Sequence, residues 1–421
     1  MIDVLIVGNG AREHALAWKI SQSTLLGKLF VAPGNAGTRD LATNVSIAVE
    51  DIDKLLSFAL DNNIDFTIVG PEIPLSLGLV DSFQEAGLSV FGPNKVAAQM
   101  ESSKVFAKNL MMKYGVPTAN SMIFSEYNEA VECLTTAKFP IVIKASGLAA
   151  GKGVFIVNSF HDGEKILDQL LRNKELGDAG EEIVIEEYLI GPEISVFAFV
   201  NGKYISELVA ACDYKKAYDG DLGPNTGGMG AYSPPKLEFW NDDIKSDVLN
   251  QVMLPVVDAM VSENIKYTGI LYAGLILTNN GPMALEFNCR FGDPEAQVVL
   301  PRLNGDLLTI LMEIVDQKGE QLSFSWSEEE CVGVVLTSKG YPEKYSKGYP
   351  IRGLQQQNRD IMVFHAGTVW NQPSDTIVTD GGRVLTLVAM GKGRGLVRDQ
   401  VYSFVESITF EGNTYRTDIG L

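Results

Sequence analysis

The stretch Glu286-Phe287-Asn288-Cys289-Arg290-Phe291-Gly292-Asp293-Pro294-Glu295 ends an apolar, strand-like run. Residues i and i+2 of a strand project from the same face, so Glu286 and Asn288 present a carboxylate and an amide side by side. This pair suits a hard cation such as Mg²⁺, which takes oxygen ligands and shares them with phosphates. Arg290 follows two residues later, and its planar fork suits a phosphate or a carboxylate. The stretch therefore predicts a site for a metal ion and a phosphate. The alternative is a strand end with solvated polar residues.

Length and charge limit the classes of protein to consider. The chain has 421 residues, which exceeds one hydrophobic core and predicts roughly three domains. Acidic residues outnumber basic ones 53 to 34, and the net charge of −19 argues against a nonspecific nucleic-acid binder. No apolar run approaches the roughly 20 residues of a membrane span, and the first residues lack the pattern of a signal peptide. We therefore expect a cytoplasmic protein that acts on small molecules, without nucleic-acid or membrane partners. We favour a monomer, although the sequence itself does not give the oligomeric state.

Cysteines and histidines offer little catalytic material. The four cysteines are scattered, with no Cys-x-x-Cys and no neighbouring histidine, so a zinc site or a disulfide frame is not expected. The three histidines are His14, His161 and His365. Chemistry built on a histidine general base therefore has few candidates.

Alternating patterns predict the organisation of the chain. Residues 1–92 alternate short strands with helices, which indicates a parallel sheet covered on both faces. We expect its strands at 4–7, 29–32, 66–69 and 88–91, and its helices at 11–22, 52–62 and 77–86. A helix at 102–114 precedes a small α/β unit at 120–190, with strands at 141–145, 154–157 and 183–188. Two hairpins are expected at Asn201-Gly202 and Asn279-Asn280-Gly281, with a glycine-rich loop at 223–230 and a long helix at 242–263 between them. From about residue 331 the chain predicts a C-terminal α+β domain.

The turn Gly8-Asn9-Gly10 follows the first strand and opens a helix. Its glycines let the backbone approach an anion, and a helix N-terminus supplies N–H groups and positive dipole. A dinucleotide fingerprint needs a third glycine and an acidic residue after the second strand. Here Glu13 takes the glycine position, and residues 32–38 contain no carboxylate. The pattern disfavours a nicotinamide cofactor and favours a single phosphate, the alternative being a plain strand–helix turn.

A second glycine-rich loop, Gly147–Gly153, lies between two predicted strands. It differs from a P-loop because three residues, rather than four, separate Gly147 from Gly151, and no Ser or Thr follows Lys152. We interpret it as a flap over nucleotide phosphates, with Lys152 at its tip and Lys144 on the preceding strand. The alternative is a simple hairpin loop.

Two further segments carry candidate ligands. The strand at 183–188 offers backbone groups to an adenine, and Glu193 offers a carboxylate to ribose hydroxyls, although an edge strand flanked by glutamates is common. The loop Asn225–Gly230 is rich in N–H donors and suits a small carboxylate or an acyl phosphate. Asp213 or Asp219 is suited to hold an ammonium group. The alternative for this loop is a solvated segment without a ligand.

Taken together, these segments resemble the ATP-grasp superfamily, and within it the phosphoribosylamine–glycine ligase family of purine biosynthesis. The similarity covers essentially the whole chain in family order, and its two most specific motifs are residues 224–233 and 286–295. The other motifs that carry it are residues 8–14, 33–38, 69–72, 144–153, 365–368 and 381–383.

The resemblance implies a multidomain α/β and α+β fold. Its parts would be a preATP-grasp parallel-sheet N-domain at 1–101, a two-part ATP-grasp fold at 102–120 plus 191–325 and at 121–190, and a β-rich C-terminal domain at 326–421. The implied reaction joins glycine to 5-phosphoribosylamine through glycyl phosphate, using ATP and Mg²⁺ or Mn²⁺. Both nucleophiles belong to substrates, in agreement with the scarcity of histidine.

The resemblance also implies roles for individual residues. The nucleotide contacts would be Lys104, Lys144, Gly151, Lys152, Gly153, Glu186, Glu187, Leu189 and Glu193. The metal ligands would be Glu286 and Asn288. The phosphoribosylamine site would comprise Gly8, Asn9, Gly10, Gly34, Asn35, Ala36, Gly37, Thr38 and Glu72. Glycine and its acyl phosphate would be held by Asp213, Thr226, Gly227, Gly228, Met229, Gly230 and Arg290. The catalytic residues would be Arg290, Lys144 and Asp213.

Some positions depart from the family pattern, and other functions remain as rivals. Ser146 stands where Asp is common, Tyr214 and Lys216 stand where His and Arg are common, and residues 269–277 lack a second carboxylate for a metal. The rivals are another ATP-grasp carboxylate–amine ligase or a biotin-dependent carboxylase subunit, a catalytically silent nucleotide-binding protein, and a nicotinamide dehydrogenase. The loops at 33–38 and 226–230 argue against the first, the Glu286/Asn288 pair against the second, and Glu13 against the third.

Overall fold

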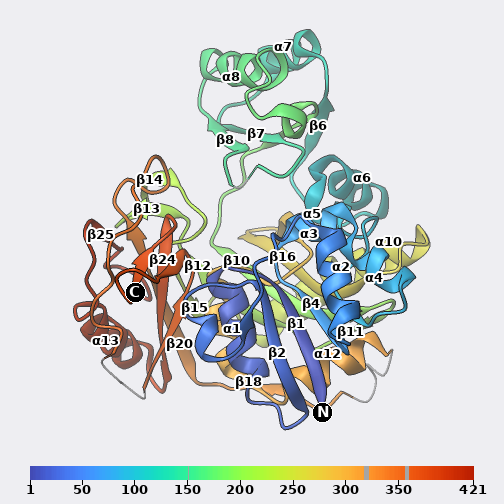
Figure 1. Cartoon of the computed structure of the whole chain (residues 1–421). Helices are drawn as coiled ribbons and strands as arrows, with labels where there is room; N and C mark the ends of the chain where they lie inside the picture. Colours follow the sequence, from blue (N-terminus) through green and yellow to red (C-terminus); the bar gives the residue numbers. More distant parts are fainter. Residues whose placement is uncertain (150, 317–321, 356–359) are drawn as a thin grey trace.

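The computed structural model describes residues 1–149, 151–316, 322–355 and 360–421. The chain forms a broad body and a small lobe that stands apart from it (Figure 1). The lobe is made of residues 121–187, and the first and last parts of the chain lie in the body. The flap predicted at Gly147–Gly153 joins two strands of the lobe, and its residue Ala150 lies outside the described residues.

A five-stranded parallel sheet, in the order β3-β2-β1-β4-β5, forms the N-terminal part of the body as predicted. Strand β1 is apolar throughout because both of its faces are covered. Val4 and Ile6 share a core with residues of α1 and α12, whereas Leu5 and Val7 share one with residues of α2 and α4. The elements are β1 (Ile2–Gly8), α1 (Ala11–Ile20), β2 (Leu26–Pro33), β3 (Thr43–Asn44), α2 (Ile52–Asp61), β4 (Phe66–Val69), α3 (Glu72–Leu77), α4 (Leu79–Glu85) and β5 (Val90–Phe91), with a 3₁₀ turn at Thr38–Asp40.

The helix expected at 77–86 forms as α4 (Leu79–Glu85), but the short helix α3 (Glu72–Leu77) that precedes it was not predicted. Gly78 has a φ of +93°, a left-handed conformation that ends α3 and separates it from α4. The helical chain therefore begins at Glu72, directly after the fourth strand, and not at residue 77. This shift brings Glu72 to the first turn of a helix at the edge of the sheet.

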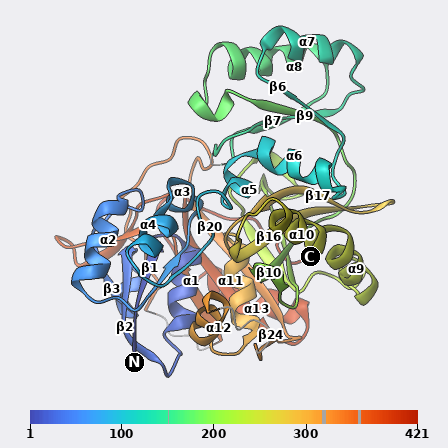
Figure 2. The same cartoon turned by 90° about the vertical axis from the view of Figure 1, so that its right-hand side faces the viewer.

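The small lobe is a four-stranded antiparallel sheet, in the order β6-β9-β7-β8, with α7 and α8 packed on one face (Figure 2). Lys144 and Glu186 lie on neighbouring strands, β7 and β9, of this sheet. Helices α5 and α6 of the body lie next to this lobe (Figure 2). The elements are α5 (Gln99–Ser102), α6 (Lys104–Tyr114), β6 (Ser121–Phe124), α7 (Tyr127–Thr136), β7 (Ile141–Ala145), β8 (Val154–Val157), α8 (Phe160–Leu167), a π-helical turn (Asp168–Arg172), a 3₁₀ turn (Gly177–Gly180) and β9 (Ile183–Glu187).

A ten-stranded sheet organises the rest of the body, with the main path β17-β16-β10-β12-β15-β20-β24-β21. Strand β15 pairs with β20, so the strands after residue 330 continue the sheet that carries Glu286. Both predicted hairpins form, between β10 and β11 and between β16 and β17.

The elements before residue 300 are β10 (Glu193–Asn201), β11 (Tyr204–Ile205), β12 (Val209–Asp213), β13 (Lys216–Tyr218), β14 (Leu222–Asn225), β15 (Gly230–Ser233), α9 (Asp242–Asp247), a π-helical segment (Val248–Met253), α10 (Leu254–Ser262), β16 (Thr268–Thr278), β17 (Gly281–Asn288) and α11 (Glu295–Val299). The later elements are a 3₁₀ turn (Leu300–Arg302), β18 (Leu303–Asn304), α12 (Leu307–Val315), β19 (Ser325–Trp326), β20 (Glu330–Ser338), β21 (Ile361–His365), β22 (Thr368–Asn371), β23 (Thr376–Thr379), β24 (Arg383–Gly391), α13 (Arg394–Val405) and β25 (Asn413–Thr414).

The glycine-rich loop expected at 223–230 is shorter in the structure and comprises residues 226–229. Strands β13 and β14 pair as a two-stranded ribbon, and β15 already begins at Gly230. The chain turns at Asp219-Gly220-Asp221, where Gly220 and Asp221 have φ values of +68° and +55°. This Asp/Gly turn chemistry is a hairpin signal that the glycine-rich reading overlooked.

The loop at 33–38 forms a joint between the first and last parts of the chain. The buried Asn35 amide donates to the carbonyl oxygens of Asn9 at 2.9 Å and His365 at 2.7 Å, and its oxygen accepts from the N–H of Gly37 at 2.9 Å. The N–H of His365 donates to Nδ1 of His14 at 2.8 Å. Burial, with the neighbouring His365, holds the pKa of His14 well below its usual value, and burial lowers the pKa of His365 to about 4. Neutral imidazoles therefore line this joint.

We expect Asn35→Ala to lower the free energy of unfolding by about 2 kcal/mol or more, because it leaves buried backbone groups without partners. Urea denaturation would measure this change, with Asn62→Ala at the exposed end of α2 as the matched control. Equal free energies of unfolding for the two variants would contradict the stabilising role of Asn35 in this joint.

Candidate active site

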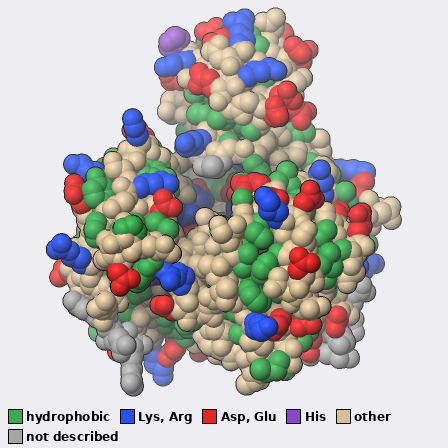
Figure 3. Space-filling model, viewed as in Figure 1, with side chains coloured by type: hydrophobic (Ala, Val, Ile, Leu, Met, Phe, Trp, Pro, Cys, Tyr) green, Lys and Arg blue, Asp and Glu red, His purple; other side chains and the backbone are tan. Residues whose placement is uncertain are grey.

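A cavity of about 460 Å³ lies between the small lobe and the body. Figure 3 shows the hollow below the lobe. The predicted site residues that line it are Glu72, Lys104, Lys144, Gly151, Gly153, Glu186, Asp213, Thr226, Gly227, Glu286, Asn288 and Arg290. The predicted site residues that do not line it are Gly8, Asn9, Gly10, Gly34, Asn35, Ala36, Gly37, Thr38, Lys152, Glu187, Leu189, Glu193, Gly228, Met229 and Gly230.

Glu286 and Asn288 lie on β17 opposite Gly274 and Tyr272 of β16. The glycine makes room for the carboxylate, because a Cβ at Gly274 would lie 3.2 Å from Cγ of Glu286. Burial raises the pKa of Glu286, but the cations Lys215, Lys104, Lys144 and Arg290 outweigh burial and hold it below its usual value. The site therefore presents an ionised carboxylate beside an amide oxygen.

This donor set fits a divalent cation that also takes oxygens from phosphates. Within the described part of the chain, no group of three or more His, Cys, Asp or Glu side chains is placed to hold an ion by itself. Tyr272 occupies the strand where a second acidic ligand was sought, and its hydroxyl donates to Glu295 at 2.8 Å. Glu295, on α11, also lines the cavity. It was not predicted as a site residue, because the second carboxylate was expected on the strand at 269–277.

A buried cluster of three charged side chains lies where the lobe meets α6. Glu186 accepts from Lys108 at 2.8 Å and from Lys144 at 2.7 Å, and Lys144 also donates to the Leu285 carbonyl at 3.0 Å. Burial lowers the pKa of Lys108 and of Lys104. Lys108 was missed, although its place one helical turn after Lys104 on α6 was a usable signal. Glu186 thus holds the Lys144 side chain in place on the lobe side of the cavity.

Arg290 is held by two carboxylates. Its guanidinium contacts Glu101 at 2.6 Å and Glu72 at 3.3 Å, and it donates to the Asn288 amide oxygen at 3.3 Å. Glu101 also accepts from the N–H of Cys289 at 2.8 Å. Burial raises the pKa of Glu101. Nothing in the sequence predicted the contact between α5 and β17 that places Glu101 beside Arg290.

A second charged group lies on the body side of the cavity and consists of Asp213, Lys215 and Glu193. Lys215 pairs with Glu193 and lies 3.8 Å from Asp213. Burial raises the pKa of Asp213 to about 7, since Glu295 and Glu193 add to burial and Lys215 opposes it. Asp213 is therefore a carboxyl group that titrates close to neutral pH.

Residues after position 330 complete this wall. Arg383 of β24 donates to the carbonyl oxygens of Gly227 and Asp293, and Tyr341 accepts from the Gly227 N–H at 2.8 Å. A Cβ at Gly227 would lie 3.1 Å from both Cζ of Arg383 and the Tyr341 oxygen, and one at Gly228 would lie 2.3 Å from Cδ of Pro294. The glycines of this loop are therefore required by close packing.

The Gly8–Gly10 turn is filled by a side chain. The N–H of Gly10 donates to Glu13 at 2.7 Å, and a Cβ at Gly8 would lie 2.3 Å from Cγ of Glu13. Glu13 is only 1% exposed and pairs with Arg12. The Glu13 carboxylate therefore occupies the Gly10 N–H within this turn, and the phosphate site expected there stays a prediction.

The remaining predicted contacts lie at the margins. Glu187 accepts from both nitrogens of Asn120, and Glu193 is half exposed beside Lys215.

Among the described residues, no helix is long and apolar enough to cross a membrane.

We expect Glu286→Gln to weaken Mn²⁺ binding in the presence of ATP, because it removes the anionic ligand and keeps the side-chain volume. The loss should exceed the roughly 10-fold that removal of an outer-shell partner costs. Electron paramagnetic resonance titration would measure it, with the exposed Glu85→Gln on α4 as the control. Equal Mn²⁺ affinity in both variants would contradict the metal site.

Comparisons with known proteins cover the whole chain. Models of the N domain, the ATP-grasp (A) domain and the C domain of phosphoribosylglycinamide synthetase match residues 2–101, 102–296 and 331–421. The phosphoribosylamine–glycine ligase of Halalkalibacterium halodurans is 46% identical, over 100% of this chain and 96% of the relative. That of Caldanaerobacter subterraneus subsp. tengcongensis is 47% identical, over 99% of each.

Solved structures agree with the fold. The crystal structure of phosphoribosylamine–glycine ligase from Thermotoga maritima has a TM-score of 0.86 at 32% identity, covering 99% of this chain and 100% of that one. The biotin carboxylase domain of Hydrogenobacter thermophilus 2-oxoglutarate carboxylase has a TM-score of 0.72 at 16% identity, covering 98% and 92%. At that identity the second likeness concerns the fold alone.

Proposed function

The chain belongs to the phosphoribosylglycinamide synthetase family and is an ATP-grasp ligase that joins phosphoribosylamine to glycine in purine biosynthesis; we propose that it works through a glycyl phosphate formed in the cavity between lobe and body. The family and the reaction predicted from the sequence are therefore confirmed. One observation carries the proposal for the intermediate. A half-buried, ionised Glu286 beside Asn288 lies among four cations, as the transfer of a phosphoryl group requires.

The proposed chemistry has two steps, and both nucleophiles come from substrates. A carboxylate oxygen of glycine attacks the γ-phosphorus of ATP, and the bond to the bridging oxygen breaks to release ADP. The amine of phosphoribosylamine then attacks the carbonyl carbon of glycyl phosphate, phosphate leaves, and the nitrogen loses a proton. Lys144 and Arg290 neutralise the charge that develops on the transferred group, and positioning supplies the rest of the acceleration.

For the nucleotide, we propose that Lys104 and Lys144 contact the phosphates, with Gly151, Lys152 and Gly153 of the flap above them. The further contacts of the proposal are Glu186, Glu187, Leu189 and Glu193. Glu286 and Asn288 would hold Mg²⁺ or Mn²⁺, which when bound screens the phosphate charges and orients them. Glu186 acts mainly by fixing Lys144, because its carboxylate bridges Lys144 and Lys108.

For glycine, we propose that Asp213 holds the ammonium group and that Arg290 and the loop Thr226–Gly230 hold the carboxyl end. Asp213, Thr226 and Gly227 all line the cavity, which supports this placement. For phosphoribosylamine, the proposed site comprises Glu72 with the loops at 8–10 and 34–38. Glu72 carries this assignment, since it lines the cavity next to Arg290. We place the protein in the cytoplasm as a monomer.

We expect the KM for glycine to rise as pH falls below about 7. The pKa of Asp213 is raised to about 7, so acidification protonates the carboxylate and removes the charge that attracts the ammonium group. The rise should approach tenfold per pH unit. Measuring KM for glycine from about pH 6 to about pH 8 would test this. An Asp213→Asn variant should have a high KM that no longer changes over this range, and a wild-type KM without pH dependence would contradict the role.

Release of ADP with MgATP, glycine and phosphoribosylamine, leaving out one component at a time, tests the reaction. ADP that requires both glycine and the amine, and that matches glycinamide ribonucleotide, is the expected result. ADP formed without either substrate would indicate an ATPase of another specificity. Absence of ADP would favour a silent nucleotide-binding protein.

A further inference from the structure

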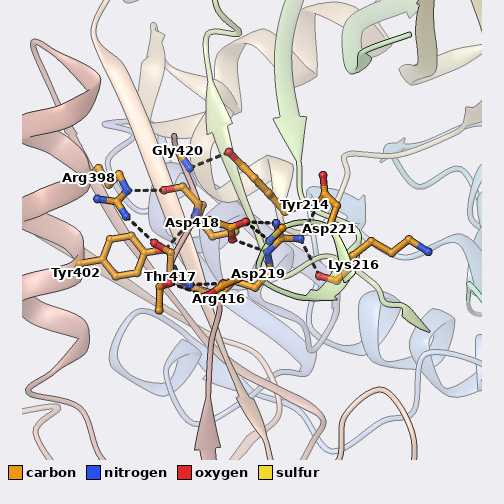
Figure 4. A network of polar contacts seen from close by, with 12 residues as sticks. Tyr214, Lys216, Asp219, Asp221, Arg398, Tyr402, Arg416, Thr417, Asp418 and Gly420 are labelled. Carbon is orange, nitrogen blue, oxygen red and sulfur yellow. Dashed lines mark hydrogen bonds and ion pairs between the residues drawn. The ribbon is translucent and has the colours of Figure 1, made fainter. Parts of the chain in front are cut away.

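The ribbon of β13 and β14 (residues 216–225) is gripped by residues 416–421, which we call the clamp segment (Figure 4). A two-stranded ribbon is marginally stable by itself. Residues 222–225 of this ribbon are exposed, so core packing gives that strand little support. The contacts with the clamp segment therefore decide where the ribbon lies.

Arg416 is the centre of these contacts. Its side chain is 1% exposed, and it donates to the Lys216 carbonyl at 3.0 Å and to Asp221 at 2.8 Å on the ribbon. The other edge of the guanidinium donates to Asp418 at 2.6 and 2.7 Å. The guanidinium carbon also lies 4.8 Å from the centre of the Tyr214 ring. Each edge of the arginine fork is thus used, which a lysine cannot reproduce.

The turn of the ribbon is fixed separately. Asp219 accepts from the N–H and the hydroxyl of Thr417 at 2.7 and 2.6 Å. The N–H of Gly220 donates to Asp418 at 2.9 Å. The ribbon is therefore held both at its base and at its turn.

The clamp segment is itself held from behind by α13. The Tyr402 hydroxyl donates to the Arg416 carbonyl at 2.7 Å and accepts from the Ile419 N–H at 3.1 Å, while Arg398 donates to the Ile419 carbonyl at 3.1 Å. Ile419 is fully buried against the end of the glycine loop, since a Cβ at Gly230 would lie 2.8 Å from it. The grip is therefore anchored to the core.

The ribbon leads directly into the cavity. Lys215 precedes β13 and Thr226 follows β14, and the Thr226 N–H and hydroxyl donate to the Lys215 carbonyl at 2.7 and 2.9 Å. Lys215, Thr226 and Gly227 all line the cavity. A displacement of the ribbon would therefore move the residues proposed to hold glycine.

We propose that Arg416, Asp418 and Asp219 are positioning residues that hold the ribbon so that Lys215 and the loop at 226–230 keep the geometry needed to bind glycine. This inference rests on the proposed glycine site. It also gives Tyr214, one of the departures from the family pattern, a part in the clamp. Its ring lies beside the Arg416 guanidinium, and its hydroxyl accepts from the Gly420 N–H at 3.0 Å.

The test compares Asp219→Ala and Arg416→Lys with Asp258→Ala, an exposed acid on α10, as the matched control. We expect both clamp variants to raise the KM for glycine roughly tenfold or more, because small misplacements at a reacting centre are costly. The KM for ATP should stay within about twofold, since the proposed nucleotide contacts other than Leu189 and Glu193 come from α6 and the lobe. Hydrogen exchange should be faster across residues 216–225 in the clamp variants and unchanged in the control.

The outcomes separate positioning from simple stability. A fall in kcat with both KM values unchanged would mean loss of folded enzyme and would overturn the proposal. So would a KM for glycine within about twofold of the control in the folded variants. Should Arg416→Lys fail to fold, Asp219→Ala decides alone, because it removes an exposed side chain. Wild-type protein without glycine-dependent ADP release would refute the proposed function, whereas active wild type with unaffected variants would refute only the clamp.

Discussion

The ionised carboxylate of Glu286 inside the protein is the feature on which the site depends. Burial alone would favour its protonated form, and the four cations around it reverse that preference. These cations come from different parts of the chain: Lys104 from α6, Lys144 from the lobe, Lys215 from the start of the ribbon and Arg290 from the end of β17. A chain with a net charge of −19 thus gathers four cations around one carboxylate of the cavity.

Three of these four cations are held in place by carboxylates. Glu186 binds Lys144, Glu101 and Glu72 bind Arg290, and Glu193 binds Lys215. A fixed cation needs no reorganisation when charge moves during the reaction, which is the principal means by which such sites lower a barrier. The positioning role proposed for Arg416 extends the same principle to the backbone that carries Lys215.

Local patterns in the sequence predicted part of this arrangement. The prediction that Glu286 and Asn288 lie side by side depends only on the geometry of a strand. The prediction from the apolar runs at 4–7 and 66–69 depends only on a sheet that is covered on both faces. Glu101, Arg383 and Arg416 could not be found in this way, because contacts between distant segments bring the first two to the cavity and Arg416 to the ribbon. The part that Glu13 plays in the Gly8–Gly10 turn was missed for a different reason. Glu13 lies three residues after Gly10, a capping-box spacing in which the side chain folds back onto the turn, and this signal was present.

Anomalous diffraction from crystals grown with Mn²⁺ and a non-hydrolysable ATP analogue tests the central claim most directly. The account predicts a manganese peak bonded to a Glu286 carboxylate oxygen and the Asn288 amide oxygen, at about the 2.0–2.1 Å typical of small hard cations. The analogue's phosphate oxygens should complete its shell, within reach of Lys144. A manganese ion bound elsewhere in the cavity, with Glu286 still surrounded only by lysine and arginine, would contradict it.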